Sequence, residues 1–413
     1  MQRPSPWFML VVLLLGILLL REPRFARAEE WFLSWMVKHA ETRGPAVPLT
    51  VVEIGADPLT TRPSTPPTNN SIPSVGSGTP SPLEFALFLQ SLLDFQPRVI
   101  AFENIMGWRE RDKDQEQVFL DQAMRVPKLL LASELGANAD PDAPWAEIRG
   151  FAQVTGKRGE LAAYSGVVRQ PNEDLRLIST AGFVNLPDEI SSEIRIPLLF
   201  LYRGEVIPSF TLQTILLWLK ITPAEVKIVL GSRIELPQGR RIPIGSDGTM
   251  IINPTAAQRA RHLSLNELLL AAQQREMGHG NELADLKDQI VLARTPNNPL
   301  SPPEMFAASI ATIVGQSYLR RVPMVFDCVI LILLAATAGW FRRIERVDLL
   351  LCGIALSAAY CLIALGTLAR WNIWLPGLLP LGGLWLSILC ALFFRSKEEA
   401  ARDASIGLPP PIA

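Results

Sequence analysis

Four polar side chains in the middle of the chain are candidates for binding or chemistry. Asp57 and Glu103 each follow a short apolar run that predicts a strand, and open α/β sheets bind ligands beyond the carboxyl ends of their strands. Two carboxylates beyond neighbouring strands could bind a cation or act as an acid and base pair. The alternative is a solvated turn acid and an ion-paired or helix-capping acid. Asn185 and Asn253 also stand near predicted strand ends, where they could bind a polar ligand or fix loops through backbone groups.

Other catalytic and metal-binding patterns are missing from the sequence. The histidines lack the short spacing of zinc ligands on one helix, and no G-x-S-x-G, phosphate-binding glycine loop or H-E-x-x-H occurs. All four cysteines lie after residue 323 inside apolar stretches, which is typical of buried thiols rather than of disulfides. We therefore expect no enzyme, no metal site and no cofactor. The residues concerned are His39, His262, His279, Cys328, Cys352, Cys361 and Cys390.

The composition favours a membrane protein that does not bind nucleic acid. The 413 residues are 49% hydrophobic and 19% charged, which is too apolar for a disordered scaffold. Lys and Arg number 39 against 40 Asp and Glu, so no basic field is available to attract a nucleic acid.

Four long apolar runs lie at the two ends of the chain, at residues 7–20, 323–341, 349–369 and 371–394. Crossing a bilayer takes about 20 apolar residues, and the last three runs are long enough. The first is shorter, and charged residues separate it from an A-x-A pattern at residues 26–28. We expect an uncleaved anchor there, with a cleaved signal peptide as the alternative.

The basic residues near the runs predict the orientation. Arg342, Arg343 and Arg346 lie between the second and third runs, and the tail after the fourth begins with basic residues, so both segments should be cytoplasmic. The predicted organisation is an anchor (1–28), an outer domain (29–322), a three-helix membrane bundle (323–394) and a cytoplasmic tail (395–413).

Two charged residues near the membrane form a possible pair. Asp327 lies inside the second run, and Arg370 lies in the short loop that joins the last two runs. The predicted orientation places both on the outer side. They could pair and fix the packing of the spans, or Asp327 could simply reach the water of the headgroups.

The outer domain is predicted to be α/β, with a mixed, largely parallel sheet and flanking helices. Residues 56–82 are dominated by Pro, Thr, Ser, Asn and Gly and predict a mobile loop. Strand and helix patterns then alternate, with strands at 49–54, 99–103 and 128–132 and helices at 83–95 and 113–125. Residues 136–180 have no clear period and predict irregular structure. Asp247-Gly248 suits a hairpin turn, Ser264 with Glu267 forms a capping box, and a last helix is expected at 303–318.

Several stretches, in this order, resemble one known family. They are RVIAFENIM from residue 98, GFVNLPDEISSEIRIPLLF from 182, VIPSFTLQTILLWL from 206, RIPIGSDGTMIIN from 241, LKDQIVLA from 286 and PPEMFAASIATIVGQSYLRRVP from 302. With one anchor before them and three spans after them, they resemble the type-two CHASE domain. The chain departs from that family after the first strand, where Gly55 and Ala56 replace an acidic pair, and at RTPNNPLSPP, which replaces a glycine-rich turn with an aspartate. If those positions bind a ligand in the family, part of that site is missing here.

The resemblance implies an extracellular sensory module of the kind attached to cyclases and histidine kinases. Residues 395–413 are too few to fold as a kinase or cyclase, since independent domains need about 40 residues or more. We therefore expect a multi-pass protein of the bacterial inner membrane that binds an unknown small molecule or protein outside and signals through a separate effector. The alternative is a structural envelope protein anchored by the bundle.

Overall fold

The computed structural model describes residues 23–40, 45–55, 81–108, 113–137, 149–186, 194–278, 286–295, 304–323 and 346–389, together with 325–327, 329–330, 332–333 and 391–392. The chain divides into two compact units. We name the two units after the organisation predicted from the sequence: the outer unit comprises residues 44–318, and the membrane unit comprises residues 1–43 and 319–413.

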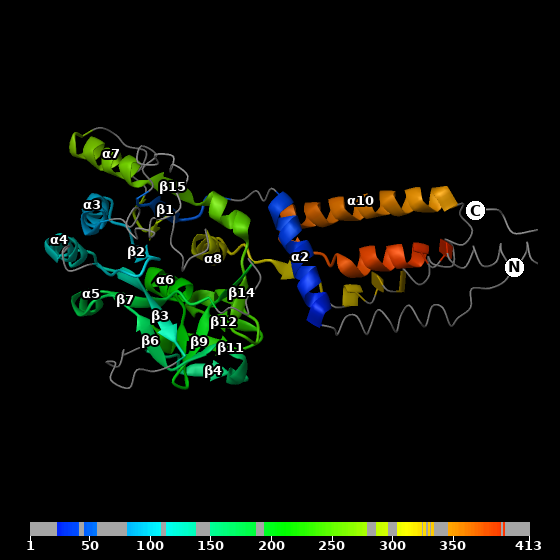
Figure 1. Ribbon diagram of the computed structural model, residues 1–413, viewed down its shortest axis with the longest axis horizontal. Coiled ribbons are helices and arrows are strands. Elements are labelled where there is room, and N and C mark those ends of the chain that lie inside the picture. The colour runs from blue at the N-terminus through cyan, green and yellow to red at the C-terminus, as the bar shows by residue number, and fades with distance from the viewer. Residues whose placement is uncertain are drawn as a thin grey trace, which may run out of the picture. The chain divides into compact units, whose positions relative to one another are not determined.

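A largely parallel sheet forms the centre of the outer unit (Figure 1). Its strands run in the order β15, β1, β16, β2, β3 and β6, and β7 also pairs with β3. All of these pairs are parallel except β3 with β6, which confirms the expected sheet type. The strands are β1 (Leu49–Glu53), β2 (Val99–Phe102), β3 (Leu129–Gly136), β6 (Gly166–Arg169), β7 (Thr180–Phe183), β15 (Arg261–Ser264) and β16 (Ile290–Arg294).

One expectation about this sheet was wrong. The strands before Asp57 and Glu103 are not neighbours, because β16 lies between β1 and β2 and pairs with both. The local pattern of residues predicts that a segment is a strand. It does not specify the strand's partner, which here comes from more than 180 residues further along the chain.

Both faces of the sheet are covered, which explains why its central strands are apolar without alternation. Successive side chains point to opposite faces, so Val52 packs with one set of helices and Val51 with another. The first set is α3 (Pro82–Leu93), α4 (Lys113–Ala123), α5 (Glu173–Ile178) and α7 (Leu265–Glu276). The second is α6 (Phe210–Leu219), α8 (Met305–Val314) and the 3₁₀ helix η5 (Pro254–Arg259).

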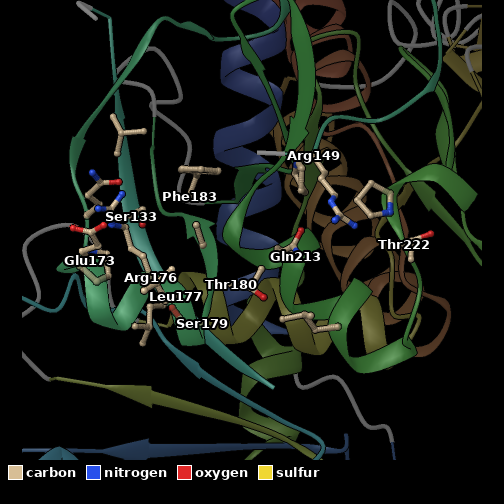
Figure 2. Close-up of a pocket in the computed structure, with 18 of the residues that line it drawn as sticks. Ser133, Arg149, Glu173, Arg176, Leu177, Ser179, Thr180, Phe183, Gln213 and Thr222 are labelled. Atoms are coloured by element: carbon tan, nitrogen blue, oxygen red, sulfur yellow. The ribbon is translucent and has the colours of Figure 1, made fainter. Parts of the chain in front are cut away.

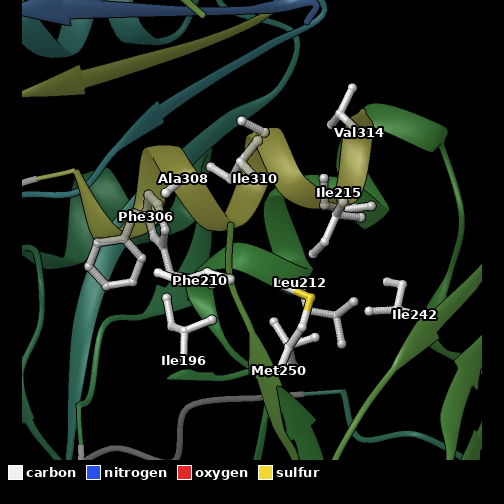
Figure 3. Packing of buried hydrophobic residues seen from close by; sticks show 14 of the residues in the cluster. Ile196, Phe210, Leu212, Ile215, Ile242, Met250, Phe306, Ala308, Ile310 and Val314 are labelled. Carbon is white, nitrogen blue, oxygen red and sulfur yellow. The ribbon is translucent and has the colours of Figure 1, made fainter. Parts of the chain in front are cut away.

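The second core joins α6 to α8. Figure 3 shows Phe210, Leu212 and Ile215 of α6 beside Phe306 and Ile310 of α8. The rings of Phe210 and Phe306 meet edge to face with centroids 5.1 Å apart, a favoured aromatic arrangement. The two helices therefore form one packed pair.

Short strands complete the outer unit. They form three small sheets: β10-β9-β5, β13-β12-β11-β4 and β14-β8. Their bounds are β4 (Gln153–Thr155), β5 (Ala163–Tyr164), β8 (Arg195–Pro197), β9 (Leu199–Tyr202), β10 (Glu205–Pro208), β11 (Lys227–Val229), β12 (Arg233–Glu235), β13 (Arg241–Pro243) and β14 (Thr249–Ile251). The 3₁₀ helices η2 (Arg158–Glu160), η3 (Pro223–Glu225) and η4 (Pro237–Gly239) connect them.

Two local expectations need correction here. The segment 136–180 contains β4, β5, β6 and α5 rather than irregular structure; these pieces are too short for a period to show, and pairing with distant strands stabilises them. The Asp247-Gly248 turn exists, with Gly248 at φ 72°, but it does not close a hairpin. The flanking strands join different sheets, since β13 pairs with β12 and β14 pairs with β8.

Two predicted helix starts can be compared with the structure. The capping box of Ser264 and Glu267 at α7 is confirmed. Helix α3 begins at Pro82, at the end of the segment expected to be a loop, because Ser81 and Glu84 form another capping box and proline fits the first helical position. Residues 56–80 lie outside the described residues.

The membrane unit contains α2 (Pro23–His39), β17 (Arg320–Arg321), α10 (Arg346–Trp371), β18 (Ile373–Trp374) and the apolar helix Leu378–Leu389. Within the described residues, Val347–Trp371 is the one helix long and apolar enough to cross a membrane. The expected run at 7–20 and most of that at 323–341 lie outside the described residues. Several spans therefore remain a prediction.

Candidate functional site

The predicted pair of acids is only half described. Glu103 directly follows β2, is 4% exposed, and its backbone N–H donates to the carbonyl of Ala293 at 3.2 Å. Asp57 lies outside the described residues. Among those described, no group of three or more His, Cys, Asp or Glu could hold a metal ion.

Other polar groups gather at this carboxyl edge. Arg294, at the end of β16, donates from Nε to Oε1 of Glu53 at 3.0 Å, and the side-chain amide of Asn104 donates to the Thr295 hydroxyl. Within the part of the chain that the structure describes, Asn104 Oδ1 and Arg294 Nη1 are buried and have no hydrogen-bond partner. Sequence reasoning missed Arg294 and Asn104, although Asn104 directly follows the strand predicted at 99–103.

Asn185 extends the sheet. Its Oδ1 accepts from the backbone N–H of Leu135 at 2.7 Å, and its Nδ2 donates to the carbonyl of the same residue at 2.8 Å. The two bonds continue the pairing of β3 with β7 beyond Phe183. The side-chain amide of Asn185 therefore fixes the backbone of its neighbours, which is the alternative to ligand binding that the sequence left open.

Asn253 lies in the core at the end of α8. It is 1% exposed. The Thr255 hydroxyl donates to its Oδ1 at 2.7 Å, and its Nδ2 donates to the Ser317 carbonyl at 3.4 Å. Its backbone N–H donates to the Thr312 hydroxyl of α8 at 3.0 Å. These bonds hold the segment through which the chain leaves the outer unit.

A pocket of about 760 Å³ lies beside the edge strand β7. Side chains from β3, β6, α5, β7 and α6 line it, together with Arg149 before β4 and residues 221–223 after α6. Figure 2 shows Arg149 and Arg176 on opposite sides of this pocket, with Gln213 and Thr180 between them in the view. The pocket is thus a concave site whose lining mixes apolar side chains with charged and neutral polar ones, and concave sites of this kind can bind small molecules.

Cations lie near the carboxyl end of α6, the helix that lines part of the pocket, and one of them, Arg98, pairs with Asp288. Lys128 donates to the carbonyl of Leu217, a lining residue, at 2.6 Å. Partial burial lowers the pKa of Lys128, and the nearby charges of Lys220 and Arg98 lower it further. Three cations therefore lie close enough to one another to interact at this end of α6.

The membrane unit places the second predicted pair differently. Asp327 is 2% exposed, and Arg321 Nη2 lies 3.2 Å from its Oδ2. Arg370 instead lies over the ring of Trp371, with its guanidinium carbon 5.8 Å from the ring centroid. The guanidinium beside Asp327 thus comes from β17, six residues before it.

The short strand β17 is tied to the loop between α10 and the last described helix. It runs parallel to β18, with hydrogen bonds from Arg320 N to Asn372 O at 2.9 Å and from Val322 N to Trp374 O at 3.1 Å. The Arg321 guanidinium also lies 5.5 Å from the centroid of the Trp374 ring.

A buried carboxylate of α2 binds the same loop. Glu29 is 2% exposed and accepts from the backbone N–H groups of Gly377 and Leu378 at 2.8 and 2.9 Å. Burial raises the pKa of Glu29, and the two backbone hydrogen bonds act in the opposite direction. A carboxylate suits this place because the amide groups of a helix start have no partners within the helix.

The chain matches the family of the CHASE2 domain over residues 10–339. It therefore belongs to the CHASE2 family, whose members are extracellular sensory domains. No curated protein and no solved structure matches it.

The family's stretches contribute to the pocket. Phe183 of GFVNLP lines it, as do Pro208 and Gln213 of VIPSFTLQ. The two arginines of the pocket come from residues 149–176, a segment without clear periodicity and outside the stretches quoted above. No sequence signal could have brought Arg149 and Arg176 together.

Proposed function

We propose that this chain is a multi-pass protein of the bacterial inner membrane whose outer unit senses a ligand outside and signals through a separate effector. The membrane bundle and the cytoplasmic carboxyl terminus belong to this proposal. Membership of an extracellular sensory family supports it, as does the apolar helix Val347–Trp371.

The observation that carries the proposal is the packing of α6 on α8. Gln213 and Leu217 of α6 line the pocket. The same helix contacts α8 through Phe210 and Phe306, and through the hydroxyls of Thr211 and Ser309, which lie 2.8 Å apart. A ligand that moves α6 must therefore also move α8 or break this packing, since packed interiors deform poorly.

Helix α8 is the last helix before the chain enters the membrane unit. Only residues 315–319 separate it from β17, and Asn253 holds the first part of this segment through Ser317. Such a short, anchored connection transmits a displacement that a flexible linker would absorb. The mechanism is a ligand-dependent shift of α8 that is passed to β17 and then to the loop bound by Glu29.

An insertion tests this mechanism. Six Gly/Ser residues placed after Tyr318 should leave the outer unit folded and abolish the ligand response of the effector. The matched control is the same insertion after Gly239, an exposed turn where a side chain would meet nothing within 4 Å. The effector is first identified by crosslinking in native membranes and co-purification, and its output is then measured with each insertion. An unchanged response with the insertion after Tyr318 would contradict the mechanism.

Reporter fusions test the topology. A reporter after Ala413 should be active only in its cytoplasmic form, and one inserted at Ser74 only in its extracytoplasmic form, because of the basic residues at 342–346. Both reporters on one side of the membrane would refute the arrangement.

The structural alternative makes a different prediction. Ligand-independent co-assembly with other envelope proteins would favour that alternative over the sensor.

A further inference from the structure

We propose that the pocket beside β7 binds a small organic anion, a carboxylate or phosphate group carried on an apolar body. The assignment of this ligand as the signal rests on the sensory function proposed above. The binding site itself rests on the chemistry of the pocket.

The size and walls of the pocket define the apolar part of the ligand. A volume of about 760 Å³ falls within the range of about 300–1,000 Å³ typical of small-molecule sites. The walls include Leu131, Val167, Phe183, Leu217 and Ile221, which come from five different segments. Removing an apolar ligand body from water against such walls is favourable.

Two arginines define the charge of the ligand. Arg149 and Arg176 both line the pocket, and neither forms an ion pair or a side-chain hydrogen bond with the residues that the structure describes. The Nε of Arg176 is buried and has no hydrogen-bond partner among the described residues. A buried donor on a charged group that lacks an acceptor costs free energy, and a carboxylate or phosphate supplies paired acceptors of matching geometry.

Neutral polar groups add hydrogen bonds. The side chains of Thr180 and Gln213 line the pocket and make no hydrogen bond within the described part of the chain. Glu173 is the one acid among the lining residues and is exposed, as is Arg149, whereas Arg176 is half-buried. Because water and salt screen exposed charges, the half-buried Arg176 is the main charge of the pocket, and the lining side chains carry two positive charges against one negative charge.

Binding is measured on the full chain in nanodiscs by calorimetry. The probes are 2-naphthoate and phenyl phosphate, with the neutral 2-naphthamide and inorganic phosphate as their controls. Both organic anions should bind saturably and raise the unfolding temperature. The neutral amide, which lacks the charge, and inorganic phosphate, which lacks the apolar body, should bind at least tenfold more weakly.

Charge removal locates the site. Arg176→Gln and Arg149→Gln should each weaken binding of the organic anions by about ten- to hundredfold, the equivalent of a lost charge-assisted hydrogen bond. Arg176→Lys, which keeps the charge, should retain part of the affinity. The matched control is Arg241→Gln, an exposed arginine of β13 that does not line the pocket and should leave binding unchanged.

The outcomes separate the ligand from the function. Absence of saturable binding of either organic anion, equal binding of the amide, or full affinity in both Gln variants would overturn the anion site. Equal affinity for inorganic phosphate would overturn the apolar part of the assignment. If the arginines prove necessary for binding but the effector does not respond to the bound anion, the site stands and the sensory function fails.

Discussion

Replacement of Asn253 distinguishes a positioning role from a ligand-binding role. The side chain is buried, accepts from Thr255 at 2.7 Å, donates to Ser317 at 3.4 Å, and does not line the pocket. If it holds the exit from α8, its removal must destabilise the outer unit whether or not a ligand is present.

The magnitude for Asn253→Ala follows from the bonds that are lost. The substitution removes two hydrogen bonds of a buried amide, those with Thr255 and Ser317, at about 1–2 kcal/mol each. The expected loss of unfolding free energy is therefore about 2–4 kcal/mol. At roughly 2 °C for each kcal/mol in a unit of this size, the unfolding temperature should fall by about 4–8 °C.

Asn253→Asp gives a sharper version of the same test. The aspartate keeps an acceptor for Thr255 but turns a second oxygen towards the Ser317 carbonyl, and at neutral pH it buries a charge. We expect it to be less stable than Asn253→Ala at pH 7. Burial raises the pKa of such a carboxyl, so its protonated form should regain stability as the pH falls.

The assay is thermal unfolding of the full chain, combined with hydrogen exchange of the peptide that covers residues 305–318. Asn185→Ala is the matched control, because the same amide makes two backbone bonds there but is only half-buried; the expected loss is about 1 kcal/mol. Wild-type stability of Asn253→Ala, or an Asp variant at least as stable as the Ala variant at pH 7, would refute the reasoning.

Two further substitutions test the structure at defined places. Gly248→Ala should lower the unfolding free energy of the outer unit by about 2–4 kcal/mol, since φ is 72° and the new Cβ would lie 2.6 Å from a side-chain carbon of Leu161. The control is Gly239→Ala, at φ 77° with open space, which should lose only about 1 kcal/mol in the same denaturant titration. Equal losses for the two variants would contradict the packing of Gly248 against Leu161. Burial raises the pKa of Glu29 above its ordinary value of 4.5. The contribution of this group to stability should therefore be complete below pH 4.5 and lost as the pH rises through the folded-state pKa. Glu29→Gln should abolish this pH dependence in thermal unfolding of the membrane unit; if the unfolding temperature of the variant keeps the same dependence on pH, another group titrates.

Local structure was largely predictable from the sequence. The apolar runs at 49–54, 99–103 and 128–132 became β1, β2 and β3, because strands buried on both faces need continuous apolar residues. Ser264 and Glu267 fixed the start of α7, since a capping box satisfies the amide groups of the first turn within four residues. Such signals are local and can be found without knowledge of the fold.

Strand partners and site residues were not predictable in this way. The insertion of β16 between β1 and β2 depends on a pairing across most of the outer unit. Pairing with β11 makes β4 a strand, although its three residues, Gln153–Thr155, are too few to show a pattern. These elements exist because distant segments supply their hydrogen bonds and their buried surface.

The family, the α/β class and a helix able to span a membrane could all be predicted from the amino-acid sequence, because each depends on the order of local motifs or on the length of an apolar run. The three-dimensional fold was needed to show that Arg149 and Arg176 share a pocket, that Asn253 holds the end of α8, and that the guanidinium beside Asp327 is that of Arg321. The physical reason is that each of these contacts is made by a side chain whose partner is set by the path of the chain. Local periodicity carries no information about that path.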